Sequence, residues 1–258
     1  GDVVCEYQSQ KRGVLCLLFG KRDFVQLMHQ QTLLKYVTTY LIKRVVRVVS
    51  EMLLNKLFVL QKNGRLMELL NIKKIILGSN SPRRSNLLKS IGLSFEIRKI
   101  DIEETYPKNL SPIKIAEFLS KKKSDHQEIN ENEILICADT LVFQGDKVYG
   151  KPKNKKNAKN MLIELSGKSH YVVTGVTLRT SKKTKTFHES TQVFFKELSE
   201  LEIEHYITKY EPFDKAGSYG IQEWLGHIGI NKIIGSFNNV MGLPTQKLYT
   251  NLKKFINE

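Results

Sequence analysis

The sequence predicts an α/β domain that begins near residue 71 and follows a basic, helical N-terminal extension. From Lys73 onward, short apolar runs alternate with stretches in which apolar residues recur every three or four positions, as in strands alternating with helices. One run, residues 134–143, is almost entirely apolar, which is typical of a strand buried on both faces. The composition, 41% apolar and 26% charged over 258 residues, suits one globular domain plus an additional segment.

The N-terminal extension covers residues 1–70. Apolar residues recur at helical spacing from residue 32 to residue 60, and Lys43, Arg44 and Arg47 lie close together on that predicted helix. A basic, acid-poor amphipathic helix is compatible with organelle targeting, with binding to a membrane surface, or with packing on the main domain. A poorly ordered segment is a further alternative. The turn signal at residues 63–64 places the domain boundary near residue 70.

The net charge of +15 favours anionic partners such as nucleotides, nucleic acid or a membrane surface. Cys5, Cys16 and Cys137 are far apart and lack CxxC spacing, so neither a disulfide framework nor a zinc site is predicted. No apolar run reaches the roughly 18 residues that span a bilayer, and residues 14–19 resemble a signal peptide only weakly. A cytoplasmic location is therefore expected, with organelle targeting by the extension as the alternative.

Residues 75–92 are predicted to form a strand, a tight polar turn and a helix. Arg83 and Arg84 fall in the first helical turn, where the helix dipole disfavours cations. A bound polyanion reverses this preference, because arginines grip phosphate bidentately and the free N–H groups of a helix start bind anions. The alternative is a solvated basic helix start. We therefore predict a phosphate site formed by Ser79, Ser81, Arg83 and Arg84.

A predicted strand over residues 93–100 leads into an acidic stretch, residues 101–105. The next helix starts at residues 111–112 and ends with three consecutive lysines, residues 121–123. Cations near a helix C-terminus complement the helix dipole, so these lysines have a sufficient structural explanation without a functional role.

Asp139 interrupts the apolar strand of a predicted hairpin, whose strands cover residues 134–143 and 147–152. An ionised carboxylate in such a place costs free energy unless it pairs with a cation or a metal ion. Lys151 on the return strand is a candidate partner. Asp139 is therefore predicted to be catalytic or metal-binding, and a purely structural ion pair is the alternative.

The rest of the chain continues the α/β pattern and includes two loops, residues 213–222 and 237–244. The first loop carries two glycines and several polar side chains, which is typical of a loop that recognises a small ligand. The predicted elements around these loops are a helix capped by Asn154 and ended by Gly167, paired strands over residues 170–179 and 187–196, a helix opened by a capping box at residues 199–202, and a final helix over residues 245–256.

Several segments, taken in order, resemble the motifs of one protein family. They are residues 78–84 (its SxSPRR signature), 101–105 (its acidic DIDET-like stretch), 138–140 and 150–152 (its ADT and GKP motifs), 166–176 and 214–222. The family is the Maf proteins, which are nucleoside triphosphate pyrophosphatases. The resemblance extends from about Lys73 to the C-terminus and includes nothing in residues 1–70.

The resemblance implies a two-lobed α/β fold like that of inosine triphosphate pyrophosphatases, with a central mixed sheet, a cleft and a homodimeric assembly. It also implies hydrolysis of a nucleoside triphosphate to the monophosphate and pyrophosphate with Mg²⁺ or Mn²⁺. The implied catalytic residues are Glu104, Asp139 and Lys151, with Glu104 and Asp139 also as metal ligands, and the implied substrate-binding residues are Ser79, Ser81, Arg83, Arg84, Lys123, Lys215 and Gln222. Where the family usually reads LAxxKA, this chain has serine in place of both alanines, so Lys123 is the best but not the only candidate lysine.

Residues 219–222 resemble the family branch that prefers dTTP and UTP over the branch that acts on 7-methyl-GTP. Gln222 could hydrogen-bond a pyrimidine edge or could simply stabilise its loop. The alternatives to a pyrimidine pyrophosphatase are a 7-methyl-GTP-type enzyme and a nucleotide-binding regulator of cell division with little turnover. A nucleic-acid or membrane-surface protein acting through the extension is a third reading, but no RNA-recognition signature or Walker A sequence supports it.

Overall fold

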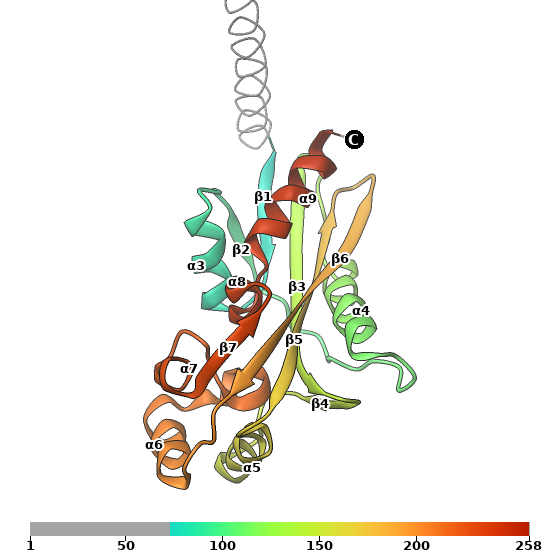
Figure 1. Cartoon of the computed structure of the whole chain (residues 1–258). Helices are drawn as coiled ribbons and strands as arrows, with labels where there is room; N and C mark the ends of the chain where they lie inside the picture. The colour runs from blue at the N-terminus through green and yellow to red at the C-terminus, as the bar shows by residue number, and fades with distance from the viewer. Residues whose placement is uncertain (1–72, 258) are drawn as a thin grey trace, which may run out of the picture. The chain divides into compact units, whose positions relative to one another are not determined.

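A seven-stranded mixed sheet organises residues 73–257, the part of the chain that the computed structural model describes (Figure 1). Its strands are β1 (Lys74–Gly78), β2 (Glu96–Arg98), β3 (Glu133–Gln144), β4 (Lys147–Tyr149), β5 (Ser169–Arg179), β6 (Thr184–Phe195) and β7 (Ile230–Ile234). The order is β2-β1-β3-β5-β6-β7, with β4 paired to β3. Strand β1 is parallel to β2 and β3, and the other pairs are antiparallel. The predicted α/β class with a central mixed sheet is confirmed.

Helices pack at both ends of this sheet. They are α3 (Pro82–Ser90), α4 (Pro112–Asp125), α5 (Lys155–Leu165), α6 (Glu200–Tyr210), α7 (Trp224–Gly229), α8 (Phe237–Met241) and α9 (Thr245–Asn257). In Figure 1, α3 and α9 lie toward one end, and α5, α6 and α7 lie toward the other. Within the described residues, none of the helices has the length and apolar character needed to cross a bilayer. The predicted helix over residues 32–60 and the boundary near residue 70 lie outside the described part of the chain.

Of the four hydrophobic clusters among the described residues, the two largest form the two lobes of the domain, and a third packs α4 on β3 and β5. One core joins α3 and α9 to the sheet through Leu88, Ile136 and Phe255, and the other joins α5, α6 and α7 to it. Strand β3 contributes Ala138 to the first core and Val142 to the second. The residues between these two positions therefore lie where the lobes meet.

One edge of β3 is open at this same point. Strand β1 pairs with β3 as far as Cys137, and β4 pairs with it from Val142 onward. Within the described sheet, residues 138–141 have no strand partner on that edge. Ligands of open α/β sheets bind in the crevice beyond the carboxyl ends of parallel strands, and the end of β1 creates such a crevice.

Gly175 of β5 determines how closely α4 can approach the sheet. A Cβ atom at this position would lie 2.2 Å from the carbonyl oxygen of Ala116 in α4, a distance that no side chain tolerates. Glycine therefore permits direct contact between the helix backbone and the strand. Ser120 of α4 and Thr177 of β5 then meet with their hydroxyl oxygens 3.0 Å apart. This contact fixes the position of the last turn of α4 relative to β5.

The predicted helix starts agree well with the structure. Asn154 accepts a hydrogen bond from the backbone N–H of Asn157, and Ser199 and Glu202 form the predicted capping box. The strand predicted over residues 93–100 is too long, because only the three residues of β2 form a strand there, at the edge of the sheet.

Helices α7 and α8 and strand β7 were not predicted from the sequence. The loop predicted over residues 237–244 is wrong in part, because α8 forms there. Helix α8 has only five residues, so hydrophobic periodicity cannot reveal it. It is held by Ser236, whose side chain accepts a hydrogen bond from the backbone N–H of Asn239.

Candidate active site

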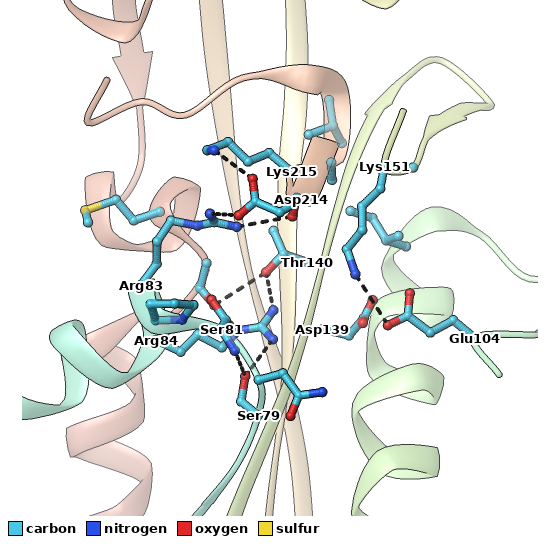
Figure 2. Close-up of a pocket in the computed structure, with 18 of the residues that line it drawn as sticks. Ser79, Ser81, Arg83, Arg84, Glu104, Asp139, Thr140, Lys151, Asp214 and Lys215 are labelled. Atoms are coloured by element: carbon cyan, nitrogen blue, oxygen red, sulfur yellow. Dashed lines mark hydrogen bonds and ion pairs between the residues drawn. The ribbon is translucent and has the colours of Figure 1, made fainter. Parts of the chain in front are cut away.

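A cleft of about 570 Å³ lies at the open edge of β3, a volume typical of small-ligand sites. Its lining includes all ten residues predicted from the sequence: Ser79, Ser81, Arg83, Arg84, Glu104, Lys123, Asp139, Lys151, Lys215 and Gln222. Figure 2 shows Arg83 and Arg84 on one side, Glu104 and Lys151 on the other, and Asp139 between them. The structure therefore gathers the predicted residues, while their individual roles remain predictions.

Two carboxylates share one lysine on one side of the cleft. Lys123 of α4 donates a hydrogen bond to Oδ1 of Asp139 and a second, of 2.8 Å, to Oε1 of Glu104. Asp139 is only 5% exposed, so an ionised carboxylate there requires such a partner. Helix α4 reaches Asp139 because it packs directly on β3 and β5.

The partner suggested for Asp139 from the sequence was wrong. Lys151 follows the end of β4, its side chain is 59% exposed, and its Nζ lies 4.0 Å from Oε1 of Glu104 (Figure 2). The hairpin places Lys151 at the rim of the cleft, whereas α4 covers the strand face to which Asp139 points.

Burial and the shared lysine move the two carboxyl pKa values in opposite directions. Burial raises the pKa of Asp139 above its ordinary value, although Lys123 and Arg84 oppose the shift. Burial alone would also raise the pKa of Glu104, but Lys123 and Lys151 hold it below its ordinary value. Paired groups with diverging pKa values are characteristic of acid–base sites, and Asp139 is the stronger base of this pair.

Arg84 is held entirely by neutral oxygens in the hydrogen bonds described for it. Its Nε donates to the carbonyl oxygen of Gly242 at 2.8 Å, Nη2 to Oγ1 of Thr140 at 3.0 Å, and Nη1 to Oγ of Ser79 at 3.4 Å (Figure 2). Burial lowers the pKa of Arg84, yet a guanidinium keeps its proton in proteins. The side chain is thus a fixed positive charge whose direct partners do not neutralise it.

Arg83 has a different environment, although it is the next residue. Its Nη1 donates to Oδ2 of Asp214 at 2.5 Å, and its Nη2 donates to the carbonyl oxygen of Asp214 at 3.4 Å. Asp214 also accepts a hydrogen bond from Lys215 at 2.7 Å, and Lys215 lies 3.0 Å from Oε1 of Glu223. Lys215 is buried and paired with two carboxylates, so the loop carries its own countercharges.

The turn before α3 leaves the helix start available to an anion. Ser81 occupies the predicted N-cap position, but its side chain makes no hydrogen bond to the helix. Its backbone N–H donates to Oγ of Ser79 at 3.1 Å. N–H groups of the first helical turn that lack a side-chain acceptor are suited to phosphate oxygens.

A buried histidine, His170, contacts the loop that follows Lys215. Nε2 of His170 lies 2.7 Å from the hydroxyl oxygen of Tyr219, and the backbone N–H of Gly220 donates to the hydroxyl of Tyr206 at 3.0 Å. Oε1 of Gln222 is buried and has no hydrogen-bond partner among the described residues. An unsatisfied buried acceptor costs about 1–3 kcal/mol, which a donor on a bound ligand would offset.

Some residues of the site were not predicted. Thr140, Asp214 and Gly242 line the cleft and hold the two arginines, and His170 supports Tyr219. Thr140, His170 and Asp214 lie in segments that resemble the family motifs, which was a signal for them, whereas Gly242 acts through its backbone carbonyl and carries no such signal.

The structure distinguishes the three lysines at the end of α4. Lys121 pairs with Asp125 one turn later at 2.6 Å, Lys122 contacts the acidic loop, and Lys123 lines the cleft. Among these three lysines, Lys123 is the one that lines the cleft, so it stays the candidate for the lysine of the family motif, in which serine replaces both alanines.

The family model described as Maf-like protein matches residues 74–255 of this chain. The chain belongs to the Maf family. A dTTP/UTP pyrophosphatase of Bacteroides thetaiotaomicron is 49% identical over 184 residues, which cover 70% of this chain and 95% of that relative. A second Maf relative, the dTTP/UTP pyrophosphatase of Phocaeicola vulgatus, is 48% identical over 192 residues, covering 73% of this chain and 100% of the relative.

The Ham1 protein of Staphylococcus aureus is a solved structure with a more distant similarity. It is 16% identical, the match covers 72% of this chain and 98% of that chain, and the TM-score is 0.39. A similarity of this size carries no argument about the function of the Maf-family chain.

Proposed function

We propose that this Maf-family chain is a nucleoside triphosphate pyrophosphatase that hydrolyses dTTP and UTP to the monophosphate and pyrophosphate, clearing such nucleotides from the cellular pool. The observation that carries the proposal is the cleft itself, in which two carboxylates on a shared lysine face two arginines at a helix start. The names of the two bacterial relatives support the choice of substrate.

In the proposed reaction, water attacks the α-phosphorus. The bond between the water oxygen and Pα forms, the bond between Pα and the bridging oxygen breaks, and pyrophosphate leaves. Asp139 accepts the proton of the water, since its buried carboxylate has the raised pKa of a stronger base. Arg84 and Lys151 stabilise the charge that develops on the phosphate oxygens and on the departing pyrophosphate.

Asp139 and Glu104 would hold a divalent metal ion. Their carboxylates converge on the same Nζ of Lys123, and Mg²⁺ is commonly held by one or two carboxylates together with substrate phosphates. Within residues 73–257, no group of three or more His, Cys, Asp or Glu side chains could hold a metal ion. Phosphate and water oxygens would therefore complete the coordination. Bound Mg²⁺ or Mn²⁺ would neutralise phosphate charge.

Gln222 is the proposed contact to the base. Its buried, unpartnered Oε1 is an acceptor, and the N3–H group of thymine or uracil is a donor on the edge that a base would present to it. The phosphate side of the cleft recognises only the triphosphate, so discrimination between bases falls to the loop that contains Gln222. A 7-methyl-GTP-type activity is the alternative.

The test is pyrophosphate release from dTTP, UTP, CTP and 7-methyl-GTP with Mg²⁺ or Mn²⁺, and with a chelator as the metal-free control. We expect the highest kcat/KM for dTTP and UTP and little release without the metal. Preference for 7-methyl-GTP would overturn the pyrimidine assignment. Nucleotide binding without pyrophosphate release would favour the regulatory alternative.

The remaining proposals concern the context of the domain. Residues 1–70 are proposed to be a basic, helical extension of unknown role, and the protein is proposed to be a cytoplasmic homodimer. A comparison of the full chain with residues 71–258 in the same nucleotide assay should give equal kcat/KM values, and sedimentation should give the mass of two chains. Organelle import of a reporter fused to residues 1–70 would contradict the cytoplasmic location.

A further inference from the structure

Lys122 contacts the backbone on both sides of Glu104. Its Nζ donates to the carbonyl oxygen of Glu103 at 2.8 Å, to the carbonyl oxygen of Thr105 at 3.1 Å and to Oγ1 of Thr105 at 2.8 Å. An ammonium group has three N–H donors, and here it meets three oxygen acceptors. All three belong to the residues that flank Glu104 in the sequence.

Apart from Ile102, which packs against a hydrophobic cluster that includes Ile100, the acidic loop has few other contacts to fix its backbone. Residues 101–106 form no helix or strand, and none of the backbone–backbone hydrogen bonds described for loops and turns involves them. Asn80 anchors the preceding residue, Ile100, through two hydrogen bonds. A segment with so few backbone hydrogen bonds opens readily unless side chains hold it.

Glu104 needs a defined position because its carboxylate is 43% exposed and must meet Lys123 inside the cleft. Lys122 and Lys123 are consecutive residues of α4, so one helix end holds both the backbone and the carboxylate of the same glutamate. The close contact at Gly175 sets the distance between α4 and the sheet, and so the position of that helix end.

We propose that Lys122 is a positioning residue that fixes the backbone around Glu104 and thereby places its carboxylate beside Asp139. The proposal rests on the proposed pyrophosphatase function for its catalytic consequence. Lys122 does not line the cleft and touches no reacting group; it acts through Glu104. Arginine is a poor substitute, because its planar fork cannot direct three donors from one nitrogen toward converging oxygens.

The test compares Lys122→Met with Lys121→Met, a matched control one residue earlier on the same helix whose partner is the exposed Asp125. We expect Lys122→Met to lower kcat by about ten- to hundredfold, as expected when a catalytic group is misplaced by about 1 Å, with a much smaller change in KM. The control should retain its kcat, and both variants should have similar melting temperatures. Equal kcat values for the two variants would overturn the proposal.

A double-mutant cycle with Glu104→Gln separates positioning from a general structural role. If Lys122 acts through Glu104, adding Lys122→Met to Glu104→Gln should cause no further loss of kcat. Multiplicative losses would mean that Lys122 acts by another route and would contradict the proposal.

Backbone order parameters from ¹⁵N relaxation test the same contact without any enzymatic assay. The order parameters of residues 101–106 should be lower in Lys122→Met than in the full-length wild type, whereas those of α4 should be unchanged. Unchanged order parameters in this loop would overturn the proposal. If the wild type releases no pyrophosphate from any nucleotide, the proposed function fails, but this measurement still decides whether Lys122 orders the loop.

Discussion

The two sides of the cleft handle charge in opposite ways. On the carboxylate side, which comprises Glu104, Lys123, Asp139 and Lys151, each acid has a lysine within 4.0 Å. On the arginine side, which comprises residues 79–84 and 212–218, the guanidinium of Arg84 bonds only to neutral oxygens. Neutral acceptors can orient a cation and still leave its charge free to attract phosphate. The two carboxylates, in contrast, share a lysine that favours their ionised forms, against the burial that raises the pKa of Asp139.

The arginine side itself contains both arrangements. Arg83 is neutralised by Asp214, whereas Arg84 is not paired with a carboxylate in the described contacts. Burial alone would raise the pKa of Asp214, but hydrogen bonds from Lys215 and Arg83 hold it below its ordinary value. Adjacent arginines of one motif should therefore contribute differently to binding and turnover.

Asp139→Asn should produce the largest effect. Without a proton acceptor, kcat should fall by about a hundred- to ten-thousandfold, while nucleotide binding measured by calorimetry persists because the arginine side is intact. Asp146→Asn in the exposed hairpin turn is the control and should be silent. Full activity of Asp139→Asn would remove the functional distinction between the two sides.

The stability of the protein should depend on pH through His170, which contacts Tyr219 in the loop that follows the arginine side. Burial lowers the pKa of His170 from 6.5 to about 4, so the unfolded chain binds more protons than the folded chain between these values. Stability should then fall as the pH drops from about 6.5 to about 4, by roughly 3 kcal/mol from this group. Denaturant unfolding at both pH values should show this loss in the wild type and a smaller one in His170→Gln. Equal losses would contradict the assignment.

A comparison of Arg84→Lys with Arg83→Lys tests the difference between the two arginines. Lysine cannot reach all three oxygens that Arg84 holds, so hydrogen bonds in this partly buried cluster are lost and stability should fall by about 1–3 kcal/mol. The kcat/KM of Arg84→Lys should also fall more than that of Arg83→Lys, where a lysine can still pair with Asp214. Equal effects in steady-state kinetics and thermal unfolding would show that the neutral and ionic arrangements are equivalent.

The smallest expected effect is a shift of the acidic limb of the pH–rate profile. Activity should decline as the pH falls through the raised pKa of Asp139, because the protonated carboxyl cannot accept a proton. The charge of Glu104 helps to raise the pKa of Asp139. In Glu104→Gln, the acidic limb measured on the remaining activity should therefore shift to lower pH. Glu103→Gln, the exposed neighbour, should leave the limb in place. A shift to higher pH in Glu104→Gln would contradict the coupling.

Much of the fold could be predicted because its signals are local. The capping box at Ser199, the N-cap at Asn154 and the apolar run of β3 each depend on residues within a few positions of one another. Helix α8 and strand β7 could not be predicted in this way, since five-residue elements contain little periodicity and are held by contacts with β6 and Thr191.

The sequence by itself, together with its resemblance to the family, determined the α/β class, the order of most elements and ten of the residues that line the cleft. Only the tertiary structure decided how those residues pair: Asp139 with Lys123, Arg83 with Asp214, and Arg84 with Gly242 and Thr140. The physical reason is that periodicity and capping act over one or two turns, whereas these pairs depend on how α3 and α4 pack against the sheet. The contact of α4 with Gly175 is the clearest case, because it sets the position of Lys123, which holds both carboxylates.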